Sequence, residues 1–136
     1  MTNHGLSKGY HQEASQIFEE AENHFKRGDW HLVVRRSQEV VELSLKALLR
    51  HEGIEIPKFH DVGAVLKANR HFFPDIEIDR LASISRKRFN ERETSFYGEE
   101  ETGLSPQEIY SNIDAKEAIE EARYVWESVK KRLQSC

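Results

Sequence analysis

The 136-residue sequence has little cysteine, little proline and no long apolar run, and each shortage excludes a class of protein. Its one cysteine, Cys136, cannot form an internal disulfide, which favours a reducing compartment. No apolar run approaches the ~20 residues of a membrane span, and no signal-peptide core follows Met1. We therefore expect a cytoplasmic protein without a membrane partner.

The motifs of metal and nucleotide sites are also missing. The seven histidines show no metal-ligand spacing, because His60 and His71 have no matching histidine or cysteine partners. Gly63 is not part of a glycine-rich loop that follows a strand. The net charge of −4 disfavours non-specific nucleic-acid binding, although it leaves room for a local basic patch. We predict no metal ion and no cofactor.

The dominant positive signal is the helical periodicity of residues 30–53. Apolar and small residues recur there with the spacing of a helix that has a wide buried face, at Trp30, Val33, Val34, Ser37, Val40, Val41, Ser44, Leu45 and Leu48. Asp29 supplies a candidate N-cap oxygen, and Gly53 can adopt the left-handed conformation that ends a helix. This pattern predicts the central helix of a bundle.

Other helical segments flank this central one. We predict a loose segment over residues 1–8, a first helix over 9–27, a short helix capped by Asp61, a fourth helix over 75–97, a short turn opened by Ser105, and a last helix capped by Asp114. No stretch has the alternation of a strand. The predicted fold is therefore all-α: an antiparallel up-and-down bundle of four main helices with one or two short additional helices, forming a single domain over residues 9–136.

Two arginines of the fourth helix are the first candidates for chemistry. On a helical wheel Arg88 and Arg92 lie in the apolar sector of that helix. A buried arginine needs a partner, because an unpaired buried charge is very costly. One interpretation is structural: the two side chains extend outward to solvent or form ion pairs with Glu42 or Glu93. The other is an anion site, since the planar guanidinium donates two hydrogen bonds to phosphate at once.

Three further residues could contribute to a site. Tyr97 follows Arg92 by five positions, so its hydroxyl could lie beside that arginine or be half-buried in the core. Lys58 and His60 precede a predicted helix start, where a histidine could bind a ligand or only hold the loop through Asp61 or a backbone group.

Taken together, three motifs resemble the HEPN family of helical bundles. Residues 38–42 (QEVVE) followed by 45–49 (LKALL), the turn over 57–61 (PKFHD) and the pair of Arg92 and Tyr97 occur in the order and spacing of its small stand-alone members. The similarity covers roughly the whole chain from the first helix onward. The resemblance implies a symmetric homodimer, with the arginine motifs facing a shared cleft, and a minimal nucleotidyltransferase as partner, as in toxin–antitoxin pairs.

Many members of that family are endoribonucleases or toxins in which a histidine follows the arginine after four to six residues. Here Tyr97 occupies that position, and the sequence has no histidine beyond His71. A tyrosine of pKa ~10 is a poor general base at neutral pH, which disfavours nuclease activity.

Three hypotheses follow. The first is a binding module that holds a nucleotide or RNA phosphate with a ligand-binding set of Arg88, Arg92, Tyr97, Glu42, Lys58 and His60, or that docks a nucleotidyltransferase. The second is a metal-independent endoribonuclease toxin in which Arg92 and Tyr97 are catalytic. The third is a purely structural helical adaptor.

Overall fold

The computed structural model describes residues 2–56 and 62–134, and the ordered elements within them are all helical. The helices are α1 (Thr2–Arg27), α2 (Trp30–His51), α3 (Val62–Ala68), the 3-10 turn η1 (Arg70–Phe72), α4 (Ile78–Asn90), α5 (Arg92–Tyr97), α6 (Pro106–Ile109) and α7 (Asn112–Gln134). No strand is present in these two ranges, where the only extended pairing is an isolated bridge between Glu99 and Leu104. The all-α prediction is confirmed.

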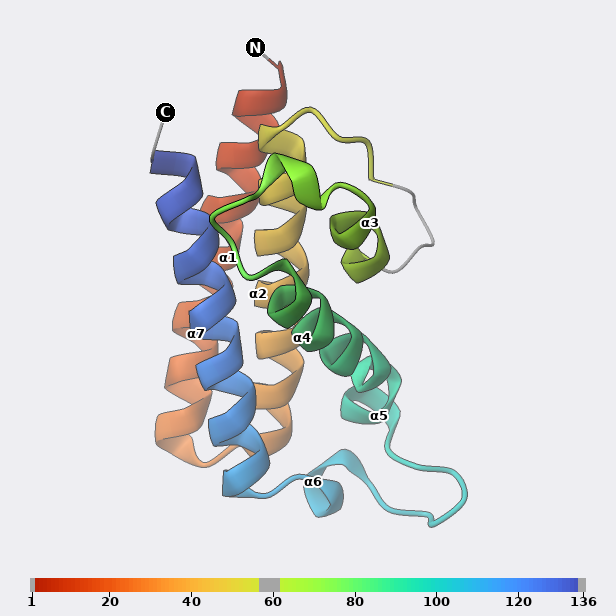
Figure 1. Ribbon diagram of the computed structural model, residues 1–136. Helices are drawn as coiled ribbons and strands as arrows, with labels where there is room; N and C mark the ends of the chain where they lie inside the picture. The colour runs from red at the N-terminus through yellow and green to blue at the C-terminus, as the bar shows by residue number, and fades with distance from the viewer. Residues whose placement is uncertain (1, 57–61, 135–136) are drawn as a thin grey trace.

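The long helices α1, α2 and α7 lie side by side, and α4 crosses them obliquely (Figure 1). α1 and α2 form an antiparallel hairpin across Gly28, whose φ of 78° is the left-handed value that ends a helix. α7 runs antiparallel to α1, so the start of α1 and the end of α7 lie at the same end of the bundle (Figure 1). Four main helices were predicted and are present, and α3, α5, α6 and η1 are shorter additions.

α2 is the centre of the bundle, since it packs against each of the other α-helices. Every apolar or small position predicted for its inner face from Val33 to Leu48 is buried, as are Ala47 and Leu49. Leu45 is fully buried in a cluster that includes Leu81 of α4 and Val125 of α7. Gly53 has the predicted left-handed φ, at 72°.

The first helix begins earlier than we predicted. Residues 1–8 were expected to be loose, but α1 starts at Thr2. The Ser7 hydroxyl is buried and donates a hydrogen bond of 2.7 Å to the carbonyl of Ala47 in α2. A single tertiary contact of this kind has no periodic signal, which is why the sequence did not reveal it.

The structure also differs from the prediction at two helix caps, Asp29 and Asp114. Asp29 is at the N-cap position of α2, but its side chain makes no capping hydrogen bond and instead pairs with Arg27 at 3.4 Å. α7 begins before Asp114, whose carboxylate accepts hydrogen bonds from the backbone N–H of Ser111 at 2.9 Å and from its hydroxyl at 3.1 Å. Ser111 and Asp114 thus form the reciprocal start signal. The box predicted at Ser105 is present.

The predicted fourth helix is divided. Instead of running continuously over 75–97, the chain forms α4 and α5 with a turn at Glu91 between them. The Glu91 N–H donates a hydrogen bond of 3.2 Å to the carbonyl of Arg88, three residues earlier. This is the spacing of a 3-10 turn, whereas an α-helix bonds to the residue four positions earlier. Residues beyond Glu91 are therefore out of register with the apolar stripe of α4, and Phe96 in α5 is 43% exposed. Phe89, near the end of α4, is 51% exposed.

Within the described residues, no helix is long and apolar enough to cross a membrane.

Candidate functional site

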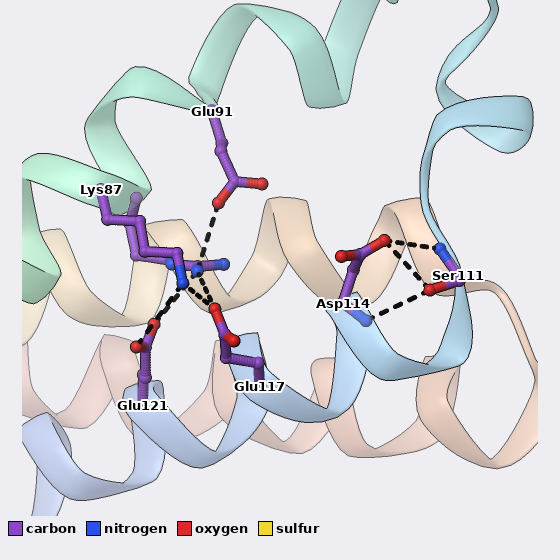
Figure 2. Close-up of polar contacts among 7 residues, drawn as sticks. Lys87, Glu91, Ser111, Asp114, Glu117 and Glu121 are labelled. Carbon is purple, nitrogen blue, oxygen red and sulfur yellow. Dashed lines mark hydrogen bonds and ion pairs between the residues drawn. The ribbon is translucent and has the colours of Figure 1, made fainter.

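Arg88 is enclosed by carboxylates. Its side chain is 3% exposed, and its guanidinium lies 3.2 Å from Glu91, 3.1 Å from Glu121 and 3.5 Å from Glu117. Lys87 also pairs with Glu117 (Figure 2). Two cations of α4 therefore face two carboxylates of α7. The expected partners, Glu42 and Glu93, are not the ones used. Arg88 therefore joins α4 to α7, which supports its structural interpretation.

Arg92 lies on the other side of the break and is open. Its side chain is 56% exposed, and its nearest carboxylate contact, to Glu42, is a loose 3.9 Å. Glu42 is shared, because it also accepts hydrogen bonds from Lys46 at 3.1 Å and from Gln38 at 3.2 Å. The prediction that Arg92 is in the apolar sector of a continuous helix was wrong, since that helix ends before it.

The chain forms an open groove of about 630 Å³ around Arg92. It is lined by Phe89, Asn90, Arg92, Glu93, Thr94, Phe96 and Tyr97. Three of these are aromatic, and their exposed fractions are 51% for Phe89, 43% for Phe96 and 82% for Tyr97. Exposed aromatic faces beside a guanidinium offer both a charge for phosphate and a surface for a planar ring.

Arg35 of α2 holds α5 in place, a role that the sequence did not reveal. Its guanidinium lies 3.9 Å above the centroid of the Phe96 ring and donates a hydrogen bond of 3.0 Å to the carbonyl of Ser95. Burial lowers the pKa of Arg35, and the neighbouring charge of Arg36 lowers it further. The contacts join residues about sixty positions apart in the chain, so no local spacing could have predicted them.

Tyr97 does not supply an acid–base group poised against Arg92. Its ring is 82% exposed and stands beside Phe96, with 5.9 Å between the ring centroids. It is close enough to Arg35 to interact with it electrostatically. Lys58 and His60, the other predicted ligand residues, lie outside the described residues. Among the residues that the structure describes, no group of three histidine, cysteine, aspartate or glutamate side chains could hold a metal ion.

The protein is thus an all-α bundle in which an exposed arginine, Arg92, lies at the break between α4 and α5. The model of the HEPN domain family matches residues 8–132, and the chain therefore belongs to the HEPN domain family. The resemblance predicted from residues 38–61 and from Arg92 with Tyr97 is confirmed at the level of the family.

Solved structures support the same fold. The crystal structure of an archaeal HEPN homologue is similar over 94% of this chain and 98% of its own, with a TM-score of 0.69 and 26% identity. The protein TT1696 from Thermus thermophilus matches over 93% of this chain and 97% of its own, with a TM-score of 0.72 and 19% identity, a likeness of fold alone. None of the curated proteins compared with the chain is a match.

Proposed function

We propose that this HEPN protein is a binding module in which Arg92 holds a phosphate group of a nucleotide or of RNA. The observation that carries the proposal is the contrast between the cations of this region. Arg88 is surrounded by three carboxylates, whereas Arg92 has one loose contact at 3.9 Å and more than half of its side chain exposed. A phosphate can reach the guanidinium of Arg92 without breaking a close ion pair.

The groove around Arg92 supports the same proposal. Phe96 and Phe89 present exposed rings on the walls where a base bound through its phosphate would extend. Base–aromatic stacking is worth about 1–3 kcal/mol per base and tolerates any sequence. The protein has a net charge of −4, so affinity has to come from this local site and not from the overall field.

Binding without cleavage fits the groups at the site. Ribonuclease chemistry needs a base that takes a proton near neutral pH, and a phenol is poorly suited to that role. The groove has no histidine among its lining residues. We therefore place nucleotide or RNA binding before the toxin alternative.

Direct titration tests the proposal. Arg92→Leu should weaken binding of a fluorescein-labelled single-stranded RNA, or of ATP, by about 10- to 150-fold, which corresponds to ~1.5–3 kcal/mol for a charge-assisted contact. Arg123→Leu is a control for the loss of an exposed arginine elsewhere, because Arg123 is 49% exposed and pairs with one carboxylate, Glu22, at 3.3 Å. Equal affinity in Arg92→Leu and wild type would reject the site and leave the structural adaptor.

The same proposal includes two protein partners. The first is a second copy of this chain, seated on the exposed aromatic residues beside Arg92. The second is a minimal nucleotidyltransferase, as the family resemblance implies for toxin–antitoxin pairs. Co-elution with a nucleotidyltransferase encoded by an adjacent gene tests the second partner, and separate elution of the two proteins would reject it.

A further inference from the structure

A second groove is lined by residues of α1 and α7 and by the end of α2. The start of α1 and the end of α7 lie at one end of the bundle, away from α5 (Figure 1). The groove has a volume of about 670 Å³ and opens between α1 and α7 beside the end of α2. Its lining residues are His4, Ser7, Lys8, His11, Gln12, Ser15, His51, Trp126, Lys130, Leu133 and Gln134. Nothing in the proposed function uses this groove.

The ionisable residues that line this groove are all basic. Its lining contains two lysines and three histidines but no carboxylate, although the chain has 24 acidic residues and a net charge of −4. His4, Lys8 and His11 are spaced four and three residues apart, so they form one stripe on α1. Trp126, Lys130 and Leu133 have the same kind of spacing on α7. The two helices thus face each other with a lysine on each wall.

Folding alone gives no reason for a lysine at position 8 of this wall. Elsewhere along the same contact between α1 and α7, opposite charges meet: Arg123 lies 3.3 Å from Glu22. The negative end of the α7 dipole accounts for Lys130, but Lys8 is in the N-terminal part of α1, where the dipole does not favour a cation. Glu52, next to His51, is already ion-paired with Arg132.

The floor of the groove is aromatic and has a cation beside it. The His11 ring stacks on Trp126 with 4.9 Å between centroids and an angle of 10°, and the Lys130 ammonium lies 5.0 Å from the Trp126 ring. The indole N–H of Trp126 is buried and has no acceptor among the described residues. Burial also lowers the pKa of His11 and of His51, so the permanent cations are the two lysines.

We propose that this groove binds a small organic anion, with its carboxylate, sulfonate or phosphate head between Lys8 and Lys130 and its apolar body against Trp126 and Leu133. The volume falls within the 300–1,000 Å³ that is typical of small-molecule sites, and a hydrophobic wall with a few convergent polar groups is the usual lining of such sites. The anion supplies the opposite charge that the lining lacks.

Two fluorescent probes of one shape test the charge requirement. Anilinonaphthalene sulfonate carries an anionic head, and phenylnaphthylamine is its uncharged counterpart. The sulfonate should bind in a saturable one-to-one manner, and the uncharged probe at least about tenfold more weakly, which is ~1.4 kcal/mol. Equal binding of the two probes, or no binding of the sulfonate at millimolar concentration, overturns the proposal.

Variants then locate the binding. Lys8→Met combined with Lys130→Met should weaken the sulfonate at least about fivefold, since two partly exposed charge contacts are lost. Lys131→Met is the matched control, because Lys131 is an exposed neighbour on α7 that does not line the groove. Wild-type affinity in the double variant overturns the proposal. Unchanged affinity in Arg92→Leu separates this groove from the proposed phosphate site.

The position of the bound probe can be read directly. In Trp30→Phe the only remaining tryptophan is Trp126, so energy transfer from it to the bound sulfonate should appear on titration. In the native chain the indole N–H resonance of Trp126 should shift, a measurement that does not depend on the folding of that variant. Benzoate and phenyl phosphate as competitors distinguish a carboxylate from a phosphate head. Absence of both Trp126 signals would place the probe elsewhere and reject the site.

Discussion

Arg88 and Arg92 are one helical turn apart in sequence, yet their side chains are 3% and 56% exposed. The turn at Glu91 separates them, so Arg88 points to α7 and Arg92 lies on the groove side of the break. Two arginines that look equivalent on a helical wheel therefore have different surroundings: Arg88 joins two helices, and Arg92 is largely exposed to solvent.

This relationship predicts opposite stability effects for the two arginines. Arg88→Met should lower the free energy of unfolding by ~2–4 kcal/mol, because the partly buried carboxylates of Glu91 and Glu121 lose this cation. Arg92→Leu should change it by less than about 0.5 kcal/mol, since a loose exposed pair contributes little. Urea unfolding followed by circular dichroism measures both, and equal losses would contradict the assignment.

The exposed aromatics predict self-association. Phe89→Glu combined with Phe96→Glu should convert a homodimer to a monomer at ~50 μM in sedimentation velocity, because charged side chains would be buried against the second copy. Phe72→Glu is the control: Phe72 is 39% exposed but lies in η1, near the far end of the molecule. A monomeric wild type at the same concentration would remove the dimer from the proposed function.

The hydrogen bonds at the helix starts predict that replacing Ser111 lowers stability more than replacing Asp29. Ser111→Ala should cost ~1 kcal/mol, because Ser111 and Asp114 exchange hydrogen bonds at the start of α7. Asp29→Ala should cost less than about half of that, since its carboxylate caps nothing and makes only long contacts, to Arg27 at 3.4 Å and to His24 at 3.6 Å. Thermal unfolding of the two variants measures the order, and a larger loss in Asp29→Ala would reverse this interpretation.

His11 predicts a pH dependence of stability. Burial against Trp126 lowers the pKa of His11 below its ordinary value near 6.5, and the charge of Lys130 lowers it further, while the hydrogen bond to the Trp126 carbonyl opposes the shift. The unfolded chain thus binds a proton that the folded chain resists, and stability falls as pH drops below the unfolded pKa. His11→Gln should flatten this loss between pH 7 and 5. A wild type that becomes more stable over that interval would contradict the prediction.

Much of the fold could be predicted from the sequence, because a helix produces a local periodic spacing of apolar residues. The buried face of α2 was predicted from apolar and small residues that recur with the 3.6-residue period of a helix. The start of α6 followed from Ser105, Pro106 and Glu108, which act on one another within one turn. The family followed in the same way, from short motifs in a fixed order.

Only the tertiary structure decided which polar residues meet. Arg88 pairs with Glu117 and Glu121, about thirty positions away in the sequence, and Arg35 contacts Phe96, about sixty positions away. No local sequence pattern indicates contacts of this kind. The break at Glu91 lies inside a segment whose pattern favours continuous helix, so its position depends on packing against α2 and α7. Local propensity set the helices, whereas long-range charge pairing and packing set which arginine is buried and which remains open.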